Sequence, residues 1–254
     1  MITSHAMGTG PRVSVWVHGW LRSSRIYEPL LPFMNPQAER WIFVDLPGYG
    51  ENRQIPGHFT VDGAVTELVR FADEIRLDRA RWVGHSMGGL VIQRLACRVP
   101  ERVASLVGIA PVPMSGLALN ERAREVYREA CTSEEARFRV FRRLAGPTIS
   151  PETIRTWVAH SRTETQDEAL WTYLESWSFE RQEPFASGLS AIPFVLVAGA
   201  TDPAITTARV TESIAPLYRH FEVHILDGVG HLPVEEDAAR VAQALVRESV
   251  QPTR

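Results

Sequence analysis

The segment GHSMGG contains a serine in a setting that suits a nucleophile. Ser86 lies between Gly84 and Gly88 in the pattern GxSxG, after an apolar run and before a stretch of helical period. A sharp strand-to-helix turn brings the two flanking positions together, where a Cβ would clash. The start of a helix also presents free N–H groups and the positive end of its dipole beside the hydroxyl. An ordinary glycine-rich turn has the same pattern, so other residues of the chain must show whether Ser86 is a nucleophile.

An acid and a base follow later apolar runs. Asp202 ends the segment PFVLVAGATDP, and His231 follows the next run in FEVHILDGVGHLPVEED. A serine hydroxyl is a poor nucleophile at neutral pH, so His231 would remove its proton while Asp202 holds the imidazole tautomer. Asp227 is the nearest competitor for the acid, but it follows the wrong run and is expected to cap a turn. The alternatives are that Asp202 is a turn residue and His231 a structural histidine.

The first apolar run, in VSVWVHGW, supplies a fourth component. Trp20 follows His18-Gly19 and is expected to give its backbone N–H to an oxyanion hole, with the N–H of Met87 as the second donor. Donors of this kind contribute on the order of 3 kcal/mol each in serine hydrolases. His18 is expected to support this loop by hydrogen bonding.

The elements that must position these residues follow an alternating pattern. Nearly continuous apolar runs separated by helical stretches predict an α/β fold with a parallel sheet covered on both faces. The expected strands are residues 13–17, 40–45, 80–84, 103–110, 193–198 and 221–226. Helical spacing predicts helices at 62–75, after Ser86, and at 235–249.

Residues 113–190 break this alternation, because they contain helical stretches and no strand-like run. Ser133 and Ser150 are expected to be N-caps. We therefore expect residues 1–112 and 191–254 to form the core and residues 113–190 a helical cap over the carboxyl ends of the strands, where open α/β sheets bind ligands.

Composition excludes several classes of function. The chain has 254 residues, 44% of them hydrophobic, and a net charge of −3, so one sizeable core is expected and nucleic acid is not an expected partner. There is no lysine, which excludes Schiff-base and P-loop lysine chemistry. Cys97 and Cys131 form no CxxC, and no metal site or disulfide framework is expected. Without a signal-like or membrane-spanning run, the protein is expected to be cytoplasmic.

Five motifs in order along the chain carry a family resemblance. HGW, DLPGYGEN, GHSMGG, GATDP and GVGHLPVEE make the sequence similar to the α/β-hydrolase superfamily. The resemblance implies a mostly parallel sheet with helices on both faces, a helical cap inserted between two strands, and no cofactor. Two departures stand out. Only about ten residues precede the first apolar run, where the family has two further strands, and Asp202 lacks the usual proline three residues later.

Within the superfamily, a serine nucleophile disfavours dehalogenases and epoxide hydrolases, which use aspartate. The expected function is hydrolysis of a small to medium carboxylic ester, thioester or lactone through an acyl-enzyme. The sequence is similar to pimeloyl-[acyl-carrier protein] methyl ester esterases in its HGW motif, its length and its arginine-rich cap. The enzymatic alternatives are C–C bond hydrolases of ring-fission products and cofactor-free haloperoxidases or perhydrolases. The alternative of another class is a ligand receptor of this fold with little turnover.

Two further hypotheses concern binding. His85, Leu21, Trp157 and Trp177 are expected to line the substrate pocket, although aromatic residues at helical spacing more often form a cap's own core. The cap is rich in arginine, which favours either a solvated helix face or an anionic partner such as an acyl-carrier protein. The arginines concerned are Arg122, Arg124, Arg128, Arg137, Arg139, Arg142 and Arg143.

Overall fold

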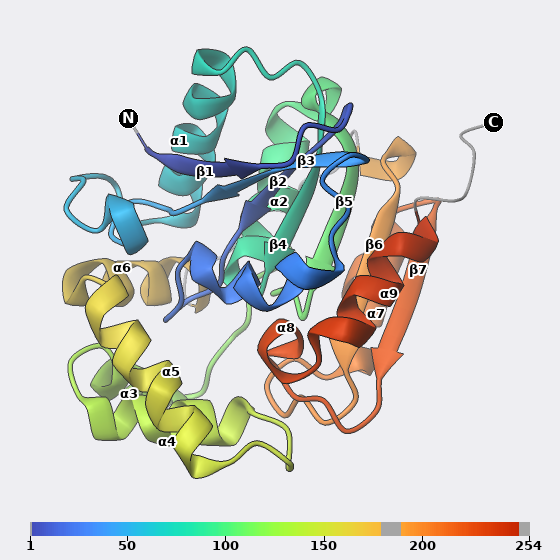
Figure 1. Cartoon of the computed structure of the whole chain (residues 1–254). Coiled ribbons are helices and arrows are strands. Elements are labelled where there is room, and N and C mark those ends of the chain that lie inside the picture. Colours follow the sequence, from blue (N-terminus) through green and yellow to red (C-terminus); the bar gives the residue numbers. More distant parts are fainter. Residues whose placement is uncertain (1, 179–188, 249–254) are drawn as a thin grey trace.

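The computed structural model describes residues 2–178 and 189–248, and these form a seven-stranded sheet with helices around it (Figure 1). The strand order is β1-β3-β2-β4-β5-β6-β7, and all neighbours are parallel except β1 and β3. The strands are β1 (Ser4–Met7), β2 (Arg12–Val17), β3 (Glu39–Val44), β4 (Ala80–His85), β5 (Val103–Ile109), β6 (Phe194–Gly199) and β7 (Phe221–Leu226). The predicted fold class is confirmed.

The six predicted strands are present with small shifts at their ends, and β1 is the addition. β1 pairs antiparallel with β3 at one edge of the sheet, with Ser4 opposite Val44 and Met7 opposite Trp41. It is only four residues long and mostly exposed. Such a strand carries no apolar alternation, because neither of its faces is buried and it is held by its pairing with β3.

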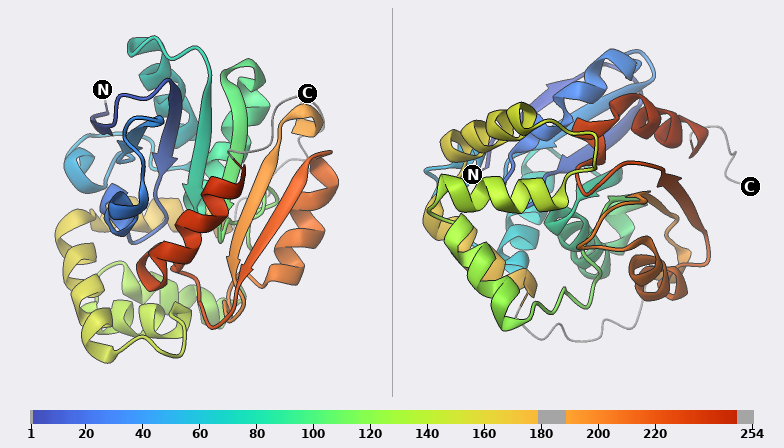
Figure 2. Two further views of the ribbon diagram at one scale, coloured as in Figure 1. Left: turned by 45° about the vertical axis from the view of Figure 1, so that its right-hand side comes forward. Right: turned by 90° about the horizontal axis from the view of Figure 1, so that it is seen from below.

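Helices cover both faces of the sheet (Figure 2). The 3₁₀ helix η1 (Ser24–Phe33) packs with α8 (Pro233–Glu236) and α9 (Ala238–Glu248) on one face. On the other face α1 (Val61–Glu74) packs against α2 (Met87–Arg98), and α7 (Thr207–Ile214) lies on the same side. The remaining short 3₁₀ helices are η2 (Gly50–Asn52), η3 (Pro100–Arg102), η4 (Leu189–Ala191) and η5 (Ala215–Leu217).

The helix expected over 235–249 is present as α9, but it begins only at Ala238, and residue 249 lies outside the described residues. Asp237 has φ −155° and ψ 71°, which is not helical, and it separates α8 from α9. Its Oδ1 accepts a hydrogen bond from the backbone N–H of Arg240, so the carboxylate stabilises the start of α9. Helical spacing continued across the break, which is why the sequence pattern did not reveal it.

Among the described residues between β5 and β6, four α-helices lie together at one end of the sheet, below it in Figure 1. Both predicted N-caps are confirmed, because Ser133 and Ser150 accept hydrogen bonds from the N–H groups of Ala136 and Thr153. Residues 179–188 of the expected cap lie outside the described residues, so its limits at 113 and 190 stay a prediction. The helices are α3 (Glu121–Ala130), α4 (Glu134–Leu144), α5 (Pro151–Glu164) and α6 (Asp167–Ser178).

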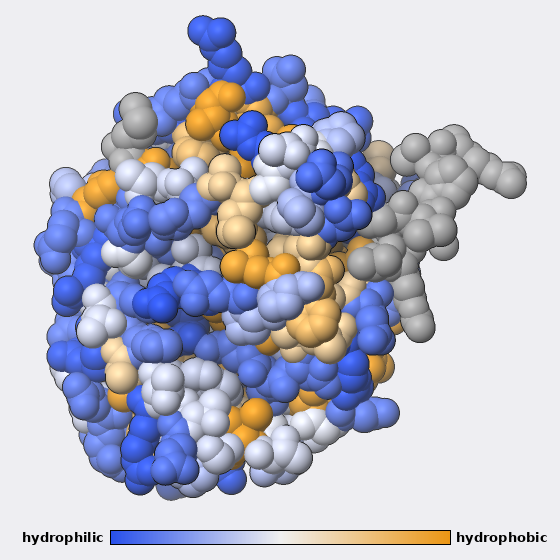
Figure 3. All heavy atoms as spheres, viewed as in Figure 1, coloured by the Kyte–Doolittle hydropathy of each residue, from blue (hydrophilic) through white to orange (hydrophobic). Residues whose placement is uncertain are grey.

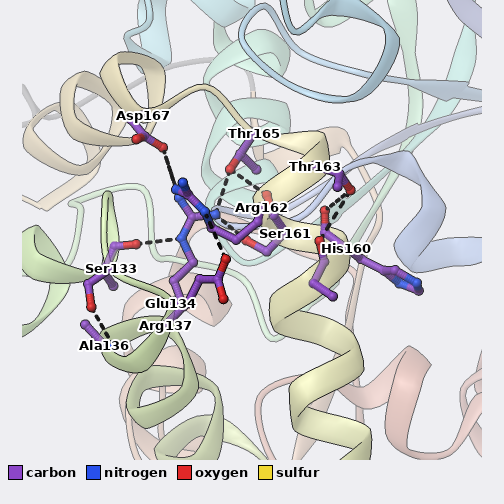
Figure 4. A network of polar contacts seen from close by, with 12 residues as sticks. Ser133, Glu134, Ala136, Arg137, His160, Ser161, Arg162, Thr163, Thr165 and Asp167 are labelled. Carbon is purple, nitrogen blue, oxygen red and sulfur yellow. Dashed lines mark hydrogen bonds and ion pairs between the residues drawn. The ribbon is translucent and has the colours of Figure 1, made fainter.

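A buried arginine links these four helices (Figure 4). Arg137 of α4 is fully buried and donates to the carbonyls of Ala130 and Cys131 at the end of α3. It also donates to Ser161 and Thr165 at the end of α5, and it pairs with Asp167 at the start of α6 at 3.3 Å. Arg137 is therefore neither part of a solvated helix face nor accessible to a binding partner.

Hydrophilic residues cover most of the surface in Figure 3, including the cap helices at its lower left. Arg139, Arg142 and Arg143 of α4 are exposed, and Arg139 pairs with Glu129 at 2.7 Å. In the part of the chain that the structure describes, we find no helix with the length and apolar character needed to span a bilayer.

Candidate active site

Ser86 occupies a strained turn between β4 and α2. Its φ of 51° and ψ of −116° lie outside the regions that non-glycine residues favour. The turn is closed by hydrogen bonds from Ser86 N–H to the Ile109 carbonyl at 3.0 Å and from Gly89 N–H to the Ser86 carbonyl at 2.9 Å. A Cβ on Gly84 would lie 2.4 Å from the Gly88 carbonyl oxygen, so the flanking glycines are a steric requirement. The predicted strand–turn–helix context is thus confirmed.

The structure brings Ser86, His231 and Asp202 together from three loops at the carboxyl ends of strands. His231 Nε2 lies 2.9 Å from Ser86 Oγ, and His231 Nδ1 lies 2.6 Å from Asp202 Oδ2. Their exposed fractions are only 9%, 6% and 4% in the order Ser86, His231, Asp202. A carboxylate can only accept a hydrogen bond, so Nδ1 carries the proton and Nε2 is left to accept from the serine hydroxyl.

The Asp202 carboxylate is held in its charged form. Its Oδ1 accepts from the N–H groups of Ala204 and Ile205 at 2.8 and 3.0 Å, while Oδ2 faces His231. Burial by itself raises the pKa of Asp202, but the attraction of His231, its hydrogen bond and the two N–H groups outweigh it, so the pKa is lowered. The loop therefore keeps its acid without the usual proline at position 205.

The loop after β2 approaches the serine closely. A Cβ on Gly19 would lie 2.6 Å from His85 Nδ1 and 3.0 Å from Ser86 Cβ, so only glycine fits. His18 fixes the loop, because its Nε2 accepts from Leu46 N–H at 3.0 Å and its Nδ1 then donates to the Gly19 carbonyl at 2.9 Å. Burial lowers the pKa of His18 and keeps the ring neutral.

The two predicted oxyanion donors lie at this junction. Met87 is the first residue of α2, and Trp20 directly follows Gly19. Among the described residues, neither backbone N–H donates to a protein acceptor. Leu21, next to Trp20, has a positive φ of 64°, a second strained position in the same loop.

His85 connects the serine turn to the histidine loop. Its Nε2 donates to the His231 carbonyl at 2.8 Å, and the two rings lie 5.3 Å apart. Burial, followed by the neighbouring His231, lowers the pKa of His85 to about 3, so the ring is neutral. The residue before the nucleophile thus fixes the backbone of the residue that would act as its base.

Glu236 is a structural partner of His231 to which the sequence analysis gave no role. Its Oε2 accepts from Gly230 N–H at 2.7 Å and from Gly146 N–H at 2.9 Å, and its Oε1 accepts from Leu232 N–H at 3.1 Å. The carboxylate thereby binds both neighbours of His231, and it also binds Gly146, two residues after the end of α4 in the cap. The available signal was a glutamate five residues after the histidine, at the end of a short helix.

Arg22 and Glu235 form a buried ion pair behind the site. Arg22 also donates to the Trp157 carbonyl at 3.2 Å, so it joins the loop after β2 to the cap and to α8. Burial raises the pKa of Glu235, although Arg22 opposes that rise. Neither residue was singled out from the sequence, because a pair 213 residues apart leaves no local pattern.

A small, partly open chamber lies beside Ser86 and His231 and offers about 30 Å³ of free space. Three of the predicted pocket residues, His85, Leu21 and Trp177, line it. Trp157 does not line this chamber; it packs against Phe141, which does, with ring centroids 6.2 Å apart. The cap contributes Tyr127, Phe141, Leu144 and Trp177 to the walls.

Other candidate residues have structural partners. Asp227 lies in the turn after β7, where its backbone carbonyl accepts from Arg240, and its expected capping role stays a prediction. Cys97 is half-buried on α2 and packs against the core. No group of three or more histidine, cysteine, aspartate or glutamate side chains among the described residues is arranged to hold a metal ion.

The family model described as the alpha/beta hydrolase family matches residues 15–244. The chain belongs to this family. A pimeloyl-[acyl-carrier protein] methyl ester esterase of Photobacterium profundum is 34% identical over 99 residues, which are 39% of this chain and 37% of that protein. The chain therefore matches well under two thirds of this curated relative's length.

Two solved structures with the same fold align with nearly the whole of this α/β hydrolase. A bromoperoxidase from Bacillus anthracis superposes with a TM-score of 0.87 over 98% of this chain and 95% of its own, at 18% identity. A thermophilic esterase from Thermogutta terrifontis reaches a TM-score of 0.81 over 98% and 92%, at 22% identity. At such identities the likeness shows the fold alone.

Proposed function

We propose that this α/β hydrolase is a serine esterase that cleaves a small to medium carboxylic ester through an acyl-enzyme. The observation that carries the proposal is the continuous hydrogen-bonded chain from Asp202 through His231 to Ser86, at the edge of a small chamber. The esterase names among its relatives agree with this reaction class.

The proposed reaction has two halves. Ser86 Oγ attacks the ester carbonyl as His231 Nε2 takes the hydroxyl proton, and the oxyanion is held by the N–H groups of Trp20 and Met87. The C–O bond to the alcohol breaks, and His231 returns the proton to the leaving alkoxide. Water then attacks the acyl-enzyme with His231 as base, which releases the carboxylic acid and restores Ser86.

Two features of the site favour this assignment. The strained serine turn exposes Oγ at the head of α2, where N–H groups and the helix dipole stabilise negative charge. The lowered pKa of Asp202 keeps a negative charge next to His231, so the imidazolium formed during attack is stabilised.

Replacement of Ser86 by alanine tests the nucleophile. We expect S86A to lower kcat for p-nitrophenyl acetate by about 10⁶, as for other triad serines. A fluorophosphonate probe should label the wild-type protein at Ser86 and leave S86A unlabelled. Ester hydrolysis by S86A at the wild-type rate would refute the assignment.

The same experiments separate the alternatives. A receptor of this fold would release one equivalent of nitrophenolate and then stop, whereas an esterase turns over repeatedly. A C–C hydrolase would act on a ring-fission dienoate and poorly on simple esters. A perhydrolase would form peracid when hydrogen peroxide replaces water in the second half-reaction.

A further inference from the structure

The end of α4 in the cap lies directly against the loop that carries His231. The backbone N–H of His231 donates to the carbonyl of Leu144, the last residue of α4, at 2.8 Å. Two residues further along the cap, the N–H of Gly146 donates to Glu236 Oε2 at 2.9 Å, and the same oxygen accepts from Gly230 N–H at 2.7 Å. The cap therefore holds the main chain of His231 directly and also through the residue before it.

Two glycines allow the cap and the histidine loop to approach this closely. A Cβ on Gly146 would lie 2.7 Å from the Gly228 carbonyl oxygen and 2.5 Å from Glu236 Oε2. A Cβ on Gly230 would lie 2.5 Å from the backbone nitrogen of Gly146. Neither Gly146 nor Gly230 has a positive φ, so a left-handed backbone does not explain why they are glycines. The reason is the close packing of one backbone against another.

The bond from the cap is one of two that fix the main chain of His231. The carbonyl of His231 accepts from His85 Nε2 at 2.8 Å, beside the serine, whereas its N–H donates to the cap. The imidazole must stay within hydrogen-bonding distance of both Ser86 Oγ and Asp202 Oδ2, at 2.9 and 2.6 Å. A displacement of about 1 Å in such a site costs about 100-fold in rate, so the support of the main chain matters for the chemistry.

We propose that Gly146 is a positioning residue for His231, and that the cap is part of what holds the base in place as well as a wall of the substrate chamber. Gly146 acts by its small size and its backbone N–H, and it does not line the chamber. The inference rests on the proposed serine esterase activity and adds a residue from the cap to the support of that site.

Replacing Gly146 by alanine tests this role. The added Cβ would press on the Gly228 carbonyl and on Glu236, so the histidine loop must move while the chamber walls stay. We expect G146A to lower kcat for p-nitrophenyl acetate by about 10- to 100-fold with KM within about threefold. Fluorophosphonate should label Ser86 more slowly by the same factor, because labelling also needs His231 to take the serine proton. Wild-type kcat in G146A would overturn the proposal.

Two further measurements separate positioning from a general loosening of the cap. The proton in the 2.6 Å hydrogen bond between His231 and Asp202 should give a strongly deshielded NMR resonance that shifts or disappears in G146A. The control is R53M, because Arg53 Nε donates to the Thr165 carbonyl at 2.9 Å and so joins core and cap away from the histidine loop. We expect R53M to keep kcat within about threefold. Equal losses in R53M and G146A would overturn a specific role for Gly146.

Hydrogen exchange in the wild-type protein tests the contact even if G146A does not fold. The amides of His231 and Gly146 donate across the contact in opposite directions, so one opening of the cap should release both. We expect their protection factors to agree within about threefold. A larger difference would show that the cap and the histidine loop open separately, which contradicts the proposal.

Failure of the esterase proposal would look different. If the wild-type protein does not hydrolyse p-nitrophenyl acetate and fluorophosphonate leaves Ser86 unlabelled, the activity itself is wrong and Gly146 has no base to position. Wild-type hydrolysis that depends on Ser86, together with unchanged kcat in G146A, would overturn only the role of Gly146.

Discussion

Gly19 packs closely against Ser86 and His85. The strain of the serine turn, of the order of 1–3 kcal/mol, is tolerated because the carbonyl of Ile109 and the N–H of Gly89 fix the backbone on both sides. The glycine lets the loop carrying Trp20 approach to within contact of Ser86 and His85. At the residue scale, the geometry of the site therefore depends on the missing Cβ of Gly19 as well as on the side chains that are present.

Replacing Gly19 by alanine should displace this loop. The added Cβ would lie 2.6 Å from His85 Nδ1, so either the loop or the imidazole must move. A displacement of about 1 Å in a catalytic site costs about 100-fold in rate, and we expect kcat/KM for p-nitrophenyl acetate to fall by that factor. Gly57, where a Cβ would meet nothing closer than 3.2 Å, provides the control G57A. Equal activity of the two variants would contradict the steric argument.

Replacing Glu236 by glutamine should disturb His231 without touching substrate. Glutamine has one acceptor oxygen where Glu236 uses two for three backbone N–H groups. We expect kcat to fall about 10- to 100-fold with KM within about threefold, because one or more N–H groups lose their partner. The exposed Glu212 gives the matched control E212Q. If kcat is unchanged, Glu236 does not position the histidine.

The cap helices are held together by polar contacts at their ends as well as by packing. Arg137 contacts α3, α5 and α6 from α4, and its burial separates it from the exposed arginines of the same helix. The hypothesis of an anionic carrier-protein partner accordingly narrows to exposed residues such as Arg142 and Arg143. At the scale of elements, one arginine organises the cap that forms the chamber's outer walls.

Replacing Arg137 by methionine should destabilise the cap. The variant would leave the buried carbonyls of Ala130 and Cys131 without donors, and breaking a buried ionic network of this kind costs about 3–5 kcal/mol. The exposed Arg139 in the same helix provides the control R139M, for which a change under about 1 kcal/mol is expected. Urea unfolding measures both, and similar midpoints would show that Arg137 does not hold the helices together.

At the scale of the whole molecule, buried neutral histidines make stability depend on pH. His18 and His85 lie under the loops of the site, and burial lowers both pKa values from 6.5, that of His85 to about 3. The unfolded chain therefore binds more protons than the folded chain between about pH 6.5 and 3. Stability that is fully present above pH 6.5 is lost as the pH falls through this window.

We expect the free energy of unfolding to fall by up to about 1.4 kcal/mol per pH unit for each such histidine below pH 6.5. Urea titrations at pH 7 and pH 5 measure this slope. His85→Gln should reduce it, while replacing the exposed His58 by glutamine should leave it unchanged. The same slope in H85Q and wild type would show that His85 contributes nothing to the pH dependence.

The sequence by itself determined the features that rest on local patterns. Apolar runs, helical spacing and the glycines around Ser86 define the order of strands and helices, because each depends on neighbours within one turn or one strand. The placement of Asp202 and His231 after later strands was also predictable, since parallel strands bring their carboxyl ends to one edge of the sheet. The N-cap roles of Ser133 and Ser150 were predictable for the same reason, because each depends on residues within one helical turn.

Only the tertiary structure decided the features that depend on distant partners. Edge strand β1 exists because β3 offers its backbone. The Arg22–Glu235 pair and the hydrogen bond from Gly146 to Glu236 join segments far apart in the chain. The burial of Arg137 and the size of the chamber follow from how the cap helices pack. Patterns along the chain encode local conformation and apolar periodicity, whereas hydrogen bonds across the fold are set only when separate elements meet.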